Sequence, residues 1–148
     1  MPKSVARRYA PWLWLLLALF CVRVIAQLIA LKTVSPFLPS FDAWHSALLP
    51  YPVLVATQLA IVAVFLRTAI RFSRRTITPN RRTGRVLLVL ASIYAIAMVA
   101  RLLLGLTVLR DHAWFNHYMP TFFHLVLAAS LGLVGHYHFY NAIPEKHT

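Results

Sequence analysis

Histidine and aspartate are the residues of this strongly apolar sequence whose types and spacing could bind a metal or cofactor. Four of the seven histidines and two of the three acidic residues are the candidate ligands: His45, His112, His117 and His124, with Asp42 and Asp111. Imidazole and carboxylate groups bind Zn, Cu and Fe, and an imidazole commonly holds the iron of heme b. The sequence therefore predicts a site for heme b or a transition metal, with His124 as the first ligand.

Arg23 and Arg101 form a second candidate site, because both lie inside long apolar runs. A charged side chain within a membrane is costly and usually faces a protein interior or a wet cavity. Gln27 follows Arg23 by four residues and shares its helix face, and Gln58 lies midway along another apolar run. Guanidinium groups bind heme propionates, lipid phosphates and carboxylates. We therefore expect these four residues to form an anion site, unless the arginines pair with nearby aspartates or carbonyl groups.

No catalytic motif accompanies these residues. The sequence contains no Gly-rich phosphate loop, nucleophile elbow, paired catalytic carboxylates or redox CxxC. Cys21 is its only cysteine. The sequence therefore does not predict an enzyme, except a membrane redox protein that would use the bound heme or metal.

The composition indicates a membrane protein. Of the 148 residues, 60% are apolar and 12% are charged, with a mean hydropathy of +0.69. An ordinary soluble domain has about 25% charged residues, so the composition disfavours that class. The 15 Lys and Arg residues against three acidic ones are interpreted as topology markers, and no nucleic-acid partner is predicted.

Four apolar segments are each long enough to cross a hydrocarbon layer of about 30 Å as a helix. They span about 9–31, 48–66, 86–109 and 119–139, and an arginine-rich loop is predicted at 67–85. The sequence therefore predicts an all-α integral membrane four-helix bundle with up-down-up-down topology, formed by residues 1–148 as one domain.

The distribution of basic residues predicts the orientation. Eleven of them fall on one side of the predicted membrane and two on the other. The positive-inside rule then places both termini in the cytoplasm, so we expect a multi-pass protein of a bacterial inner membrane. The predicted partners are the lipid bilayer, anionic lipid headgroups at the arginine-rich loop, and further copies or subunits of a membrane complex.

A weak internal repeat relates the two halves of the chain. Arg23 precedes Lys32 by nine residues, as Arg101 precedes Arg110, and a short Asp, His and Trp segment follows each pair. This pattern suggests a duplicated two-helix unit, although chance explains it equally well. Three functions remain open: a heme- or metal-binding accessory subunit for electron transfer, an anion-binding transporter or channel subunit, and an assembly protein without a ligand.

Overall fold

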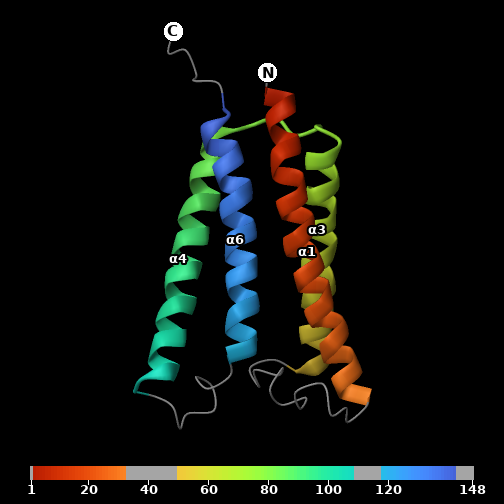
Figure 1. Ribbon diagram of the computed structural model, residues 1–148, viewed down its shortest axis with the longest axis vertical. Helices are drawn as coiled ribbons and strands as arrows, with labels where there is room; N and C mark the ends of the chain where they lie inside the picture. The colour runs from red at the N-terminus through yellow and green to blue at the C-terminus, as the bar shows by residue number, and fades with distance from the viewer. Residues whose placement is uncertain (1, 33–49, 109–117, 143–148) are drawn as a thin grey trace.

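The structure is a bundle of four long helices. The computed structural model describes residues 2–32, 50–108 and 118–142. These residues form α1 (Pro2–Lys32), α3 (Tyr51–Ser73), α4 (Arg81–Leu106) and α6 (Tyr118–Tyr140), and they contain no strand (Figure 1). Each helix has a segment long and apolar enough to cross a membrane. The predicted all-α fold with four candidate membrane spans is therefore confirmed.

The helices alternate in direction along the bundle. The start of α1, the connection between α3 and α4, and the end of α6 all lie at one end (Figure 1). We call this end the arginine-rich end, because its described residues include Arg7, Arg8, Arg67, Arg71, Arg74, Arg75, Arg81, Arg82 and Arg85. The topology is up-down-up-down, as predicted. The cytoplasmic location of this end stays a prediction.

The helices are longer at the arginine-rich end than the apolar pattern indicates. Helix α3 continues to Ser73 and α4 begins at Arg81, so the connection covers 74–80 rather than 67–85. Arginine is a good helix former, and its long side chain can reach headgroups while the helix continues. Helix α4 then begins at a defined cap, because the side chain of Asn80 accepts a hydrogen bond from the Thr83 backbone N–H at 3.1 Å.

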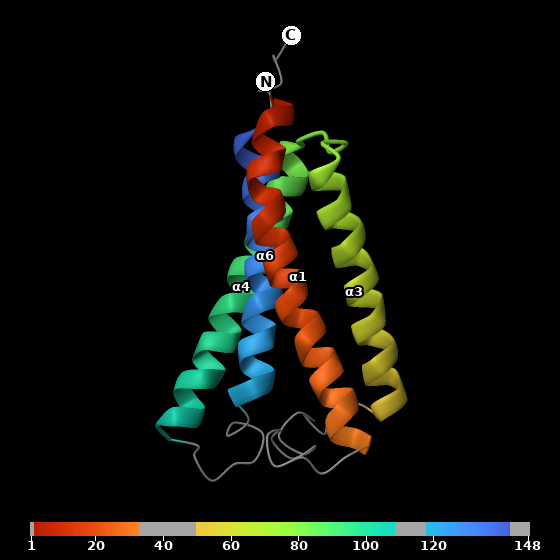
Figure 2. The same ribbon diagram turned by 45° about the vertical axis from the view of Figure 1, so that its right-hand side comes forward.

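The four helices pack as two pairs joined along one seam. Helix α1 packs on α3, α4 packs on α6, and α1 also packs on α6. Within the described residues, α3 makes no comparable contact with α4 or α6. Figure 2 shows α3 standing apart from these two helices. The bundle is therefore open along one side.

Helices α4 and α6 approach each other through glycines. A Cβ atom at Gly84 would lie 2.3 Å from the backbone N of Phe139, and one at Gly135 would lie 3.0 Å from the backbone N of Leu88. Small residues allow this close approach of two membrane helices. The glycine-bearing face of α6 is therefore covered by α4.

Aromatic side chains close the bundle at the arginine-rich end. Phe72 and Tyr137 are fully buried, and their rings meet edge to face at a centroid distance of 4.8 Å. Tyr9 packs on Tyr137 at 5.4 Å and shares a hydrogen bond of 2.8 Å with His136 Nδ1. The Tyr137 hydroxyl donates to the carbonyl of Ile77 at 3.3 Å. These contacts tie α1, α3, α6 and the 74–80 connection together.

The outside of the helices is apolar over much of its length. Large apolar side chains more than half exposed include Trp12, Val22, Ile25, Val64, Ile93 and Ile96. Soluble monomers rarely expose contiguous apolar surface on this scale. These side chains are suited to contact with lipid.

Candidate functional site

Buried polar side chains gather in the half of the bundle away from the arginine-rich end. Arg23 is 7% exposed, Gln27 1%, Gln58 4% and Arg101 6%. Arg23 lies nine residues before the end of α1 and Arg101 five residues before the end of α4, about 13 and 8 Å along their helices. Together with two half-buried residues that contact this region, they form what we call the polar cluster: Arg23, Gln27, Gln58, Tyr94, Arg101 and His124.

The two glutamines connect α1 to α3. The Nε2 of Gln58 donates a hydrogen bond of 2.9 Å to the Oε1 of Gln27. Gln27 Nε2 is itself buried and has no hydrogen-bond partner in the described structure. Leaving a buried donor unsatisfied costs about 1–3 kcal/mol. Gln27 therefore presents an open donor inside the bundle.

Arg23 reaches from α1 to α6. Its guanidinium carbon lies 5.3 Å from the ring centroid of Phe123, which is a cation–π contact. The Nε of Arg23 is buried and lacks a hydrogen-bond partner in the described structure. Arg23 and Gln27 are one turn apart on α1, so their two open donors belong to the same helix face.

Tyr94 and His124 connect α4 to α6. The Tyr94 hydroxyl is hydrogen bonded to Nδ1 of His124, and the two rings meet edge to face at 5.8 Å. The positive charges of Arg23 and Arg101 both act electrostatically on the His124 imidazole. The structure therefore brings two arginines of different helices near one histidine.

The polar cluster has a clear charge imbalance within the described residues. The acidic residues of the sequence are Asp42, Asp111 and Glu145, and all three lie outside the residues that the structure describes. Arginine does not lose its proton in proteins. A buried charge is stable only when it is paired or hydrogen bonded. Arg23 and Gln27, which carry the open donors of the cluster, are therefore suited to accept an anionic group.

One of the predicted metal or heme ligands belongs to the described residues. His45, His112 and His117, like Asp42 and Asp111, lie outside the described residues, so His124 is the one predicted ligand with a known position. Within residues 2–32, 50–108 and 118–142 there is no group of three or more His, Cys, Asp or Glu residues that could hold a metal ion. Binding of heme b or a transition metal thus stays a proposal.

The two other described histidines belong to the arginine-rich end. His136 shares its hydrogen bond with Tyr9, and His138 Nδ1 accepts the backbone N–H of Asn80 at 3.1 Å. The first bond joins the end of α6 to α1, and the second joins it to the 74–80 connection. They give His136 and His138 a structural role, separate from the polar cluster.

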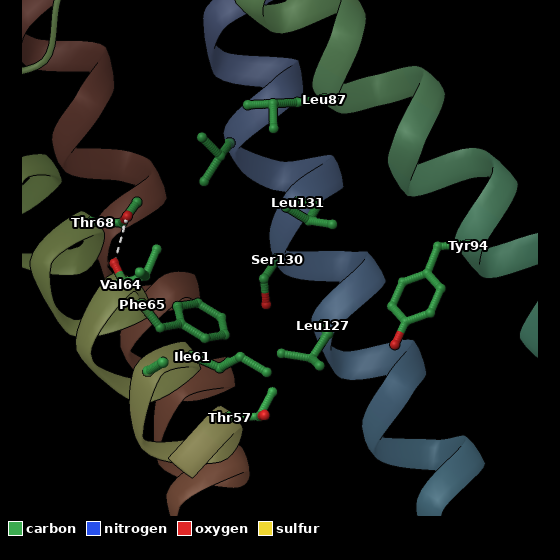
Figure 3. A pocket seen from close by; sticks show the side chains of 12 residues that line it. Thr57, Ile61, Val64, Phe65, Thr68, Leu87, Tyr94, Leu127, Ser130 and Leu131 are labelled. Atoms are coloured by element: carbon green, nitrogen blue, oxygen red, sulfur yellow. Dashed lines mark hydrogen bonds between the residues drawn. The ribbon is translucent and has the colours of Figure 1, made fainter. Parts of the chain in front are cut away.

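An apolar groove runs between α3 and the α4–α6 pair (Figure 3). Its volume is about 590 Å³. The serine and threonine hydroxyl groups on its lining, those of Thr57, Thr68 and Ser130, all donate to carbonyls of their own helices at 2.7–2.8 Å. Tyr94 also lines this space, which we call the lateral groove.

The sequence analysis missed two features of the site, because both depend on contacts between helices. Phe123 was not a candidate, because an aromatic residue in an apolar run is normally taken as a packing residue. The bond between Tyr94 and His124 also depends on the pairing of α4 with α6, which the sequence does not indicate. The one available signal was the position of Phe123 directly beside His124.

Comparisons of the chain with family models, curated proteins and solved structures found no match. The polar cluster and the lateral groove are therefore the features from which a function can be inferred.

Proposed function

We propose that this small multi-pass membrane protein binds an anionic group in the polar cluster. The observation that carries the proposal is the pair of buried open donors on one face of α1, Arg23 Nε and Gln27 Nε2. The charge of Arg23 also acts on His124 of α6. Phosphate and carboxylate oxygens accept hydrogen bonds from guanidinium and amide groups. An anion would therefore satisfy both donors and offset the positive charge.

The surrounding structure favours tight binding of such an anion. Electrostatic interactions and hydrogen bonds are stronger in a low-dielectric interior than in water. The cluster draws its side chains from all four described helices, so it is held by the bundle as a whole. A transporter or channel subunit is one role for such a site. Because four helices form a thin wall, that role would require further copies or subunits.

The anion proposal is tested by ligand-dependent stability in phosphatidylcholine nanodiscs. We expect at least one of three anions (acetate, inorganic phosphate and oleoyl lysophosphatidate) to raise the Tm at constant ionic strength. A ligand present at 100 times its Kd stabilises the folded state by about 2.7 kcal/mol. Arg23→Gln and Arg101→Gln should lose this increase. Arg85→Gln should keep it, because Arg85 is exposed near the other end of α4.

Two results would contradict the proposal. One is the absence of stabilisation by all three anions. The other is the same Tm increase in the wild type and in all three variants, which would be a general salt or lipid effect.

Heme binding is a second candidate, supported by the bond between Tyr94 and His124. Histidines that ligate metals usually engage their other ring nitrogen in a hydrogen bond, and here Nδ1 is engaged by Tyr94. Nε2 would then hold the iron, and the two arginines are suited to the propionates. His45, His112 or His117 would supply the second histidine ligand. The bound heme would supply one-electron chemistry, consistent with an accessory or electron-transfer subunit.

The heme candidate predicts a Soret band for protein purified from cells supplied with iron, heme and copper. His124→Ala should lose the band, whereas His136→Ala should retain it because His136 lies at the opposite end of α6. Elemental analysis of the same sample tests for a bound transition metal. Protein with neither a Soret band nor bound metal would remove this candidate and leave the anion proposal intact.

A further inference from the structure

The lateral groove and the polar cluster are contiguous through Tyr94. This residue lines the groove, while its hydroxyl is bonded to His124 of the cluster. Thr57 lines the groove next to Gln58, which is a member of the cluster. Tyr94 is therefore the residue through which the open apolar side of the bundle meets the polar cluster.

The groove itself is suited to an apolar occupant. Its hydroxyl groups already donate to carbonyls of their own helices, so its lining offers no open polar donor to a ligand there. Ile61, Val64, Leu127 and Leu131 form much of its wall (Figure 3). Between Thr57 and Thr68 the groove follows about 16 Å of α3. This length suits an extended hydrocarbon chain.

The charged and amide side chains of the polar cluster lie toward one end of the combined space. Gln58 and Arg101 lie toward the helix ends away from the arginine-rich end, whereas Thr68 and Leu87 line the groove closer to that end. A molecule that fills the whole space must be anionic at one end and apolar along the rest. That description fits an anionic lipid.

We infer that the polar cluster and the lateral groove together bind one anionic lipid, with a phosphate monoester headgroup at the arginines and an acyl chain along the groove. The inference rests on the proposed anion-binding function. A phosphate monoester carries about −1.5 to −2 charge at pH 7 and three acceptor oxygens. It therefore offsets the charge of Arg23 and supplies acceptors for Arg23 Nε and Gln27 Nε2.

Photo-crosslinking in phosphatidylcholine nanodiscs tests the inference directly. The probe is lysophosphatidate with a diazirine in its acyl chain, and the labelled peptides are mapped by mass spectrometry. We expect labels at Ile61, Val64 and Leu131. Unlabelled oleoyl lysophosphatidate should compete roughly tenfold better than either monoolein, which lacks the phosphate, or glycerol 3-phosphate, which lacks the chain. A tenfold difference corresponds to about 1.4 kcal/mol.

Matched variants separate the contribution of the chain from that of the charge. Ala60 lines the groove and is exposed, so Ala60→Trp should fill the groove and reduce labelling roughly tenfold, or about 1.4 kcal/mol. Ala63 is also exposed on α3 but does not line the groove, so Ala63→Trp should leave labelling unchanged. Arg23→Gln should abolish the preference for lysophosphatidate over monoolein.

Three results would overturn the inference in distinguishable ways. If glycerol 3-phosphate competes as well as lysophosphatidate and both require Arg23, the anion site stands but the lipid chain is excluded. If monoolein competes equally and Arg23→Gln has no effect, lipid binds without the cluster and the anion proposal also loses its support. If groove residues remain unlabelled and Ala60→Trp disrupts a wild-type oligomer, a second copy covers the groove.

Discussion

Gly84→Ala is expected to destabilise the protein by about 3 kcal/mol, because α4 and α6 are too close at this position to admit a Cβ atom. The added Cβ would lie 2.3 Å from the Phe139 backbone N, 2.7 Å from its Cα and 2.8 Å from the backbone carbon of His138. All three are backbone atoms and cannot rotate away as a side chain can. The two helices would have to move apart at the arginine-rich end.

Gly132→Ala is the matched control for this prediction. A Cβ at Gly132 would lie 3.8 Å from the Cβ of Ala91, which is an ordinary van der Waals contact. Alanine favours a helix over glycine by about 1 kcal/mol, so this variant should be neutral or slightly stabilised. Unfolding of both variants is followed by titration with SDS. Equal stability of Gly84→Ala and the wild type would contradict the close approach of α4 and α6.

Arg23→Met is expected to raise the free energy of unfolding by about 1–2 kcal/mol while abolishing binding of the anion. A central arginine disfavours membrane insertion by about 2.5–3.5 kcal/mol, and methionine fills a similar space without a charge. Loss of the cation–π contact with Phe123 offsets about 1–2 kcal/mol of this gain. Binding sites often reduce stability in this way, because their groups are arranged for a ligand.

The same SDS titration, with and without oleoyl lysophosphatidate, measures both effects of Arg23→Met. Arg85→Met is the control, since substitution of this exposed arginine should change stability by less than about 0.5 kcal/mol. A loss of about 3–5 kcal/mol in Arg23→Met is the size expected when one partner of a buried ion pair is removed. That result would show that the chain itself supplies an acidic partner for Arg23, against the anion proposal.

The membrane spans were predictable because an unbroken apolar run must be helical in lipid. The residues at which these spans end, at the arginine-rich end, were less predictable. Arg67 and Arg71 continue α3, and Arg81 and Arg85 lie on α4, although hydropathy alone marks all four as loop residues. A long cationic side chain can extend to the interface from within a helix, so the position of its charge does not mark the end of that helix.

The candidate site was predictable in its residue types but not in its contacts. The structure buries Arg23, Gln27, Gln58 and Arg101, the four residues that the cost of polar groups in lipid had singled out. Their individual partners depend on which helices are neighbours, and periodicity along one helix carries no such information. The lateral groove is a further example, since it exists because α3 packs on α1 and not comparably on α4 or α6.

The seam between α1 and α6 has a consequence for biosynthesis. The α1–α3 and α4–α6 pairs join helices that are adjacent in sequence, whereas α1 and α6 are the first and last of the four. Arg23 therefore meets Phe123 only after the ribosome has produced the final span. Until then its guanidinium has neither that aromatic ring nor the neighbouring imidazole. While the three following helices are being made, α1 therefore carries a charged side chain that lacks both of these contacts.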